Sequence, residues 1–260
     1  MYFFCDEMIN ISDEKVRLVH DVFTSLPFKA QWTSYARLDS FVKHPEHVEL
    51  LMEAGCIGLV FGIETLNKKT GMQIGKGLGE RAIDVLEEIR RRDMGELFLH
   101  GNFMLGLPGQ HPQETADQLM GWHEGSGRHL LDTISVNSLF LSGYNENIVA
   151  SWKELGYETS PNGDGSWKNT RDNFTYIDTL KPWGQLDVYA SRSTPMNSYS
   201  LPYLVALGIP LEEIKAFRAL KKNGDNAASA RSSAKIMGEY QDRMDTAMLD
   251  YANRLNLRGS

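Results

Sequence analysis

The chain has 260 residues, of which 42% are hydrophobic and 23% charged, with a formal net charge of −7 at pH 7. This length and composition are typical of one large folded α/β domain or two smaller ones. A negative net charge provides no overall basic field, which argues against a nucleic-acid backbone as the main partner. There is no run of roughly 18 apolar residues that would predict a membrane span. The two cysteines, Cys5 and Cys56, do not make a disulfide framework, and free thiols suit the reducing cytoplasm. We therefore expect a cytoplasmic protein, and no membrane association because no membrane span is predicted.

The first 142 residues alternate between apolar segments and helical patterns. Strands are predicted at residues 2–5, 31–36, 57–63, 97–104 and 132–140. Their nearly continuous apolar character indicates parallel strands covered on both faces. The step of roughly 25–40 residues between strands is typical of βα units in barrels and doubly wound sheets.

Helix boundaries are visible between these strands. Ser12 is a candidate N-cap for a helix whose apolar stripe includes Val16, Val19 and Phe23. Gly55 is expected to end the helix that begins near Pro45. These signals place a helix between each pair of consecutive strands.

The pattern changes after residue 142. Residues 143–200 are rich in aromatic and turn-forming residues, 210–222 predict a short helix, and 225–255 predict a long one. We therefore divide the chain into an α/β domain at 1–142 and a mostly helical C-terminal cap or substrate region at 143–260. The aromatic-rich segment suits either a substrate pocket or a cap over the end of the sheet.

Polar side chains gather where the predicted strands end. They include Asp6, Glu7, Arg37, Asp39, Glu64, His100 and Asn102, followed by the glycine-containing turn from Gly106 to Gly109. Because ligands bind at the carboxyl ends of parallel strands, these groups should converge on one site. Carboxylates accept hydrogen bonds from ammonium and ribose hydroxyl groups, arginine pairs with a carboxylate, and glycine lets a flat base approach the backbone. The set suits a ligand with an amino-acid head, a ribose and a base.

Structural roles remain open for each of these residues. Asp6 and Glu7 could be a polar strand exit, and Arg37 with Asp39 a salt bridge at the rim. Glu64 could cap a helix, and the segment that starts at Gly106 could form only a turn.

Two other motifs favour structural interpretations. Residues 71–77 resemble a phosphate loop, but the spacing is one residue short and Gly77 stands where Ser or Thr is required. His44 and His47 have the i, i+3 spacing of a zinc pair, yet exposed histidines at a helix start are the commoner arrangement.

Six short motifs occur in one order along the chain: YFFCDE (2–7), YARLD (35–39), MEAGC (52–56), FGIET (61–65), IGKG (74–77) and FMLGLPG (103–109). In this order and spacing they resemble the radical S-adenosylmethionine (SAM) superfamily. The likeness is greatest to its branch with Elp3/MiaB-type cores, members of which often follow a cobalamin-binding domain. It covers about residues 1–140.

The resemblance implies a partial (β/α) barrel that holds SAM and a [4Fe–4S] cluster, of which this chain would contain about five of six βα units. The reduced cluster of that family cleaves SAM to a 5′-deoxyadenosyl radical. By resemblance, Asp6 and Glu7 match residues at the SAM amino group, and Glu64 one near the ribose or methionine end. The segment from 101 to 106 matches one beside adenine. The cofactor-binding residues implied are Asp6, Glu7, Arg37, Glu64, Asn102 and Gly106.

The cluster motif of that family is absent from this chain. Its CxxxCxxC segment follows the first strand and precedes the part matched here, and Cys5 and Cys56 cannot replace three or four thiolates. We therefore expect a chain that begins at the second strand of the barrel: a truncation, a split subunit or a degenerate relative. It would not be active alone, and its expected partner is a cluster-bearing N-terminal fragment in trans. Cobalamin dependence, substrate and reaction type stay open. The alternative is a non-catalytic remnant that binds a ligand or partner.

Overall fold

The computed structural model describes residues 2–4, 8–122, 125, 127–141, 151–160, 164–193 and 210–222, together with residues 242 and 246. Three residues singled out above, Cys5, Asp6 and Glu7, lie outside the described residues, as does nearly all of the helix predicted at 225–255.

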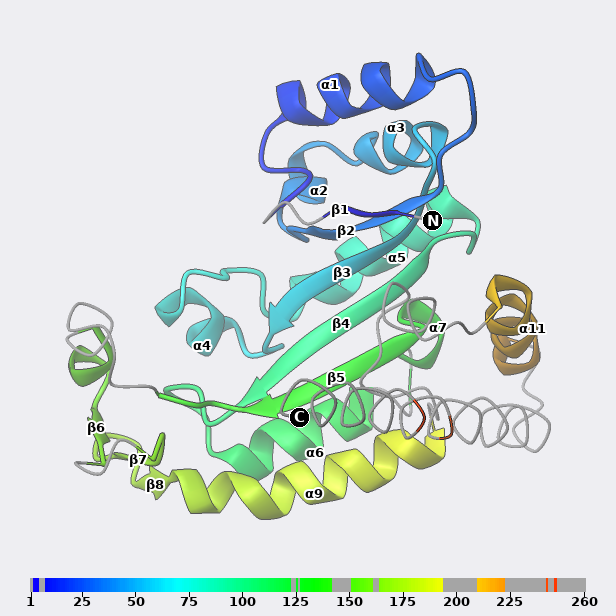
Figure 1. Ribbon diagram of the computed structural model, residues 1–260. Coiled ribbons are helices and arrows are strands. Elements are labelled where there is room, and N and C mark those ends of the chain that lie inside the picture. The colour runs from blue at the N-terminus through cyan, green and yellow to red at the C-terminus, as the bar shows by residue number, and fades with distance from the viewer. Residues whose placement is uncertain are drawn as a thin grey trace, which may run out of the picture.

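One parallel sheet organises the N-terminal domain (Figure 1). It contains β1 (Tyr2–Phe4), β2 (Trp32–Ala36), β3 (Cys56–Glu64), β4 (Phe98–Leu105) and β5 (Thr133–Ser138), in that spatial order. Each strand pairs in parallel with the next, which confirms the five predicted strands. Among the described residues no ladder joins β1 to β5, so the sheet is open rather than a closed barrel.

Helices connect consecutive strands and cover the sheet. They are α1 (Asp13–Thr24), α2 (Ser40–Lys43), α3 (His47–Glu53), α4 (Lys68–Gln73), α5 (Arg81–Asp93), α6 (Pro112–Trp122) and α7 (Arg128–Leu130). Helix α3 packs against α1 and α5. The core between the helices and the sheet includes the fully buried Trp32, Phe61 and Leu86.

Local signals in the sequence explain where these elements begin and end. The Ser12 hydroxyl accepts a hydrogen bond from the Lys15 backbone N–H at 3.2 Å, as expected of an N-cap. Gly55 follows α3 with φ +90°, and a Cβ there would lie 2.0 Å from the Ala30 carbonyl oxygen. Only glycine meets both conditions, so this position fixes the turn from α3 into β3.

A buried ion pair ties α5 to the sheet. The Arg90 guanidinium donates to Asp93 at 2.9 Å and to Asp132 at 2.7 Å, and also to the carbonyl oxygens of Leu97 and Leu130. Asp93 is fully buried, and burial raises its pKa while Arg90 opposes that shift. The guanidinium therefore compensates the charge of two buried carboxylates and donates to two backbone carbonyls.

The C-terminal region begins with a small antiparallel sheet of β6 (Tyr157–Thr159), β7 (Trp167–Asn169) and β8 (Phe174–Thr175). We expected turns followed by helices here, so these strands are a difference from the prediction. Tyr157, Trp167 and Phe174 form a separate core with edge-to-face rings. Much of the aromatic enrichment of this segment is thus explained by its own packing.

This small sheet is attached to the carboxyl ends of β4 and β5. The Tyr157 hydroxyl donates to the Gly106 carbonyl at 2.6 Å, and Trp167 Nε1 donates to the Leu139 carbonyl at 2.8 Å. These two hydrogen bonds hold the small sheet against the segments that follow β4 and β5.

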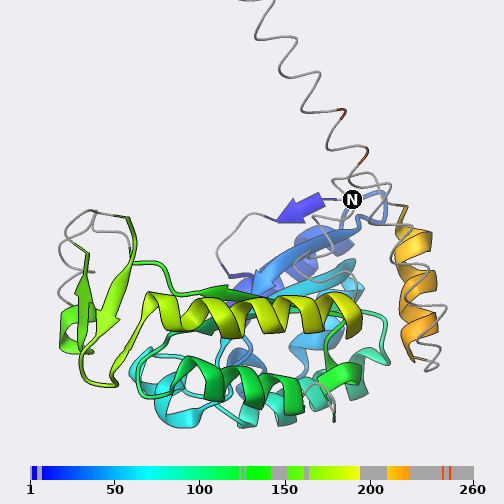
Figure 2. The same cartoon turned by 90° about the horizontal axis from the view of Figure 1, so that it is seen from below.

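Two further helices follow, α9 (Tyr176–Ser193) and α11 (Leu211–Lys222). Helix α9 contacts α6 and β5, and Figure 2 shows it running alongside α6. No helix in the described part of the chain is long and apolar enough to cross a membrane.

Candidate functional site

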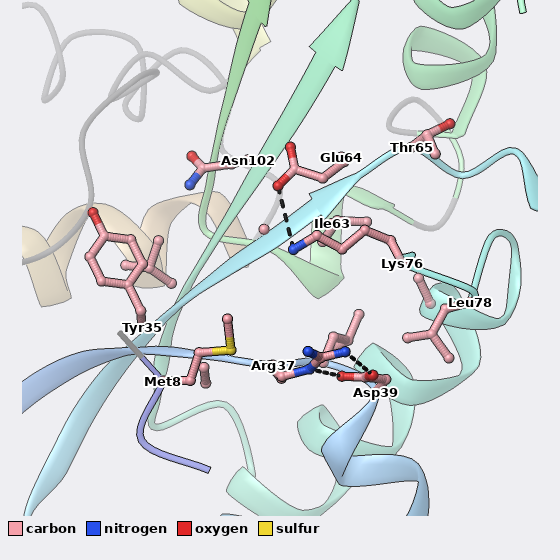
Figure 3. Close-up of a pocket in the computed structure, with 15 residues that line it drawn as sticks. Met8, Tyr35, Arg37, Asp39, Ile63, Glu64, Thr65, Lys76, Leu78 and Asn102 are labelled. Carbon is pink, nitrogen blue, oxygen red and sulfur yellow. Dashed lines mark hydrogen bonds and ion pairs between the residues drawn. The ribbon is translucent and has the colours of Figure 1, made fainter. Parts of the chain in front are cut away.

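A cavity of about 230 Å³ opens at the carboxyl ends of the central strands. Its lining includes Arg37 after β2, Glu64 at the end of β3 and Asn102 in β4 (Figure 3). The structure therefore brings together three of the six residues predicted to bind a cofactor. They meet because the carboxyl ends of parallel strands share one edge of the sheet.

An irregularity in β3 directs Glu64 into the cavity. The register with β4 shifts between Gly62 and Glu64, and Glu64 adopts φ +66°. Such a conformation is costly for a residue with a side chain and is typical of functional positions. The alternative role of Glu64 as a helix cap is not observed, because Asn67 caps α4 through a hydrogen bond to Thr70 N.

Among the described residues, Lys76 provides the cationic neighbour of the Glu64 carboxylate. Lys76 Nζ lies 3.7 Å from Glu64 Oε1 (Figure 3), and the Glu64 side chain is 20% exposed. Burial raises the pKa of Glu64, while the ammonium of Lys76 lowers it. A ligand ammonium or hydroxyl at this position would find a partly desolvated acceptor.

Gly62 provides the space for this carboxylate. A Cβ at position 62 would lie 2.6 Å from Glu64 Oε1 and 3.2 Å from Lys76 Nζ. The absence of a side chain at Gly62 is thus a condition for the observed position of Glu64.

Lys76 was not predicted to belong to the site. It stands between Gly75 and Gly77, which have φ values of +74° and +48°. Residues 74–77 form one of the six ordered motifs, but no role was predicted for their lysine. A single lysine between two glycines has no periodic signal. Lys76 reaches the cavity only through the folded conformation of its loop.

Arg37 forms a salt bridge with Asp39 at the rim of the cavity. Arg37 Nε and Nη2 donate to the two carboxylate oxygens of Asp39 at 2.8 and 2.6 Å. Hydrogen bonding to Arg37 lowers the pKa of Asp39, and burial opposes this shift. The rim salt bridge considered from the sequence is therefore present, and it holds the guanidinium at the cavity wall.

Asn10 fixes the backbone at Arg37. Its side chain accepts from Arg37 N at 2.7 Å and donates to Arg37 O at 2.8 Å, and Asn10 itself is 1% exposed. Asn10 was not predicted from the sequence, because its partner Arg37 is 27 residues away and no local pattern indicates this pair of hydrogen bonds.

A buried network orients Asn102. Asn102 Oδ1 accepts from the Ser135 hydroxyl and from His100 Nε2, the latter at 2.8 Å, while His100 Nδ1 lies 2.7 Å from Thr133 Oγ1. Burial lowers the pKa of His100 to about 4, so the ring is neutral at pH 7. With Oδ1 occupied, Asn102 Nδ2 has no acceptor among the described residues and is left as a donor toward the cavity.

The other predicted site residues do not line this cavity among the described residues. Gly106 has φ +84° and faces Trp167 and Thr179 of the C-terminal region, where a Cβ would come within 2.7 Å of the indole. Asp6 and Glu7 lie outside the described residues.

The cysteines do not fit a [4Fe–4S] cluster. Cys56 is the first residue of β3, at the opposite end of that strand from Glu64. It is buried, and desolvation raises the pKa of its thiol to about 12. Cys5 is outside the described residues, so the described part of the chain provides no thiolate at the cavity.

No family model and no curated protein sequence matches the chain. Among solved structures it is similar to coproporphyrinogen III oxidase (HemN) from Escherichia coli, a radical SAM enzyme, with 16% identity and a TM-score of 0.48. It is also similar to the radical SAM methyltransferase TsrM from Kitasatospora setae, with cobalamin and a [4Fe–4S] cluster bound, at 18% identity and a TM-score of 0.45. A third is the cobalamin-dependent SAM radical enzyme OxsB, at 13% identity and a TM-score of 0.41.

These matches cover 70%, 66% and 99% of this chain, respectively. The chain spans 38%, 33% and 48% of the three proteins, which is less than half the length of each. At these identities and scores the likeness is one of partial fold only: an α/β arrangement similar to portions of radical SAM enzymes.

Proposed function

We propose that this chain forms the SAM-binding wall of a radical SAM enzyme core. The observation that carries the proposal is the cavity at the strand ends, where Arg37, Glu64 and Asn102 meet. Arg37 and Glu64 belong to the ordered motifs that resemble this superfamily, and Asn102 directly precedes one of them.

The chemistry of the cavity matches the groups of SAM. The Glu64 carboxylate would accept from the ammonium or from a ribose hydroxyl, and the Arg37 guanidinium would attract the carboxylate of the methionine moiety. Asn102 Nδ2 would donate to an acceptor on the adenine edge. The neutral His100 holds this amide in position without adding a charge beside the base.

Radical formation requires a group that this chain does not hold. A [4Fe–4S] cluster supplies the electron that cleaves SAM, and its thiolates would come from another chain or from a segment beyond this sequence. We propose a cluster-bearing partner for this role. The activity of the chain is accordingly confined to binding and orienting SAM.

Isothermal titration of the tag-free full chain with SAM tests the proposal. Glu64→Gln should weaken binding at least tenfold, because the amide has no charge to offer the ligand. Glu114→Gln is the matched control, since Glu114 is exposed in the first turn of α6. Absence of SAM binding by the folded chain, or equal losses in both variants, would contradict the proposal.

Reconstitution with iron and sulfide tests the second part. The chain alone should show no stoichiometric [4Fe–4S] absorption, and its binding of SAM should be independent of added iron. A cluster formed on this chain by itself would refute the assignment of the thiolates to a partner.

A further inference from the structure

A second group of chemically active side chains lies near the junction of α1 with the segment that leads into α3, away from the cavity. Asp13 is the first residue of α1, and His44, Glu46 and His47 surround the start of α3. One ligand atom from each of the four residues lies within 4.8 Å of the others. We propose that these four residues form a binding site for Zn²⁺ that joins α1 to α3.

The spacing of the donor atoms supports a common ion. His47 Nε2 lies 2.9 Å from Asp13 Oδ1, and His44 Nδ1 lies 3.2 Å from Glu46 Oε1. Two ligands on a tetrahedral zinc ion are about 3.4 Å apart, given bonds of roughly 2.0–2.1 Å. Each of the two pairs already has nearly this separation, so coordination requires mainly that the pairs approach each other.

The surroundings allow this approach. The His47 side chain is 1% exposed and fixed in the core, whereas His44 is 40% and Glu46 49% exposed. The rings of His44 and His47 are stacked at 4.8 Å, and His44 can turn toward the ion through solvent. A fixed histidine with Asp13 thus provides one half of the site, and a movable pair completes it.

Burial of His47 also distinguishes this cluster from ordinary surface charges. The sequence pattern favoured exposed histidines at a helix start, but His47 is buried. Its Nδ1 atom is buried without a hydrogen-bond partner among the described residues. A buried ring nitrogen without a partner calls for an explanation, and an ion bound by the ring is one.

The charges of the four groups select a divalent ion. The carboxylates of Asp13 and Glu46 offset the charge of a divalent ion, while Arg17 donates to the other oxygen of Asp13, Oδ2, at 2.8 Å. Mixed nitrogen and oxygen ligands suit Zn²⁺ better than Mg²⁺ or Ca²⁺, which prefer oxygen alone. Four protein ligands leave no open position for a substrate, so the role of the ion is structural.

Zinc titration of the tag-free full chain tests this site, with Co²⁺ absorption as a second probe. We expect one Zn²⁺ per chain and a melting temperature that rises by about 5–10 °C at a hundredfold excess over Kd. His44→Ala and Glu46→Gln should each weaken binding at least tenfold. Neither residue is buried, so these variants should fold.

His20→Ala is the matched control. His20 also lies between two carboxylates, those of Asp21 and Glu53, each at 3.1 Å, but in the described part of the chain no second histidine joins them. This variant should bind Zn²⁺ like the parent chain. Absence of stoichiometric binding, or equal affinity of His44→Ala and His20→Ala, would overturn the proposal.

Discussion

Gly62→Ala tests whether the position of the Glu64 carboxylate determines ligand binding. The new Cβ would lie 2.6 Å from Glu64 Oε1. Nonbonded carbon contacts settle at about 3.5 Å, so the carboxylate must retreat by roughly 1 Å. It would then lose the bond to a ligand while the rest of the cavity wall stays in place.

The expected loss follows from the energy of that bond. A hydrogen bond to a charged group contributes about 1.5–3 kcal/mol, which corresponds to a loss of about 10- to 100-fold in SAM affinity. Stability should change little, because the atoms within reach of the new Cβ are the flexible ends of Glu64 and Lys76. Titration calorimetry measures the affinity, and thermal unfolding checks the fold.

Gly121→Ala is the matched control for this variant. Gly121 lies in α6, and a Cβ there meets no atom within 4 Å among the described residues. It should leave affinity unchanged. If Gly62→Ala binds SAM as tightly as the parent chain, Glu64 does not contact the ligand and the reasoning fails.

Three further predictions concern stability. Arg90→Met should lower the free energy of unfolding in urea by about 3–5 kcal/mol, because it leaves buried carboxylates uncompensated. Since burial raises the pKa of Asp93, this deficit should shrink as the pH falls. A deficit that stays constant with pH would argue against the ion pair. Gly55→Ala should lower the free energy of unfolding by at least roughly 3 kcal/mol, and Gly75→Ala by only about 1 kcal/mol. Both positions have positive φ, but only the new Cβ at position 55 would collide with backbone atoms. Equal losses in denaturant unfolding would contradict this. Burial lowers the pKa of His100 to about 4 in the folded chain, against 6.5 ordinarily, so the unfolded chain takes up the proton first. The free energy of unfolding should therefore fall by up to about 3 kcal/mol as the pH falls between these values. His100→Gln should remove that part of the pH dependence, and an unchanged dependence of stability on pH would count against it.

The parallel strands could be predicted because their signals are local. Apolar runs bounded by glycine and polar residues gave β1 to β5 with small shifts at the ends, and the cap at Ser12 and the stop at Gly55 are confirmed. The strands β6 to β8 could not be predicted in the same way. They are two or three residues long, too short to show a period, and are stabilised by aromatic packing between them.

The site was predictable to the extent that strand ends determine it. Arg37 follows β2 and Glu64 ends β3, while Asn102 lies within β4 in register with Gly62 of β3. Lys76 and Asn10 escaped prediction because a loop and a hydrogen bond across 27 residues place them. The burial of His47 likewise depends on how α1 packs on α3, which no periodic pattern within α3 reveals.

A crystal structure of the full chain grown with saturating SAM would test the central claim most directly. The account predicts ligand density in the cavity, with a nitrogen or hydroxyl group within hydrogen-bond distance of Glu64 and the base near Asn102. Density only in another hollow, such as the one lined by Cys56 and Ile214 at the opposite end of β3, would contradict it. If the same protein binds SAM in solution, a cavity without ligand density in these crystals would also contradict the account.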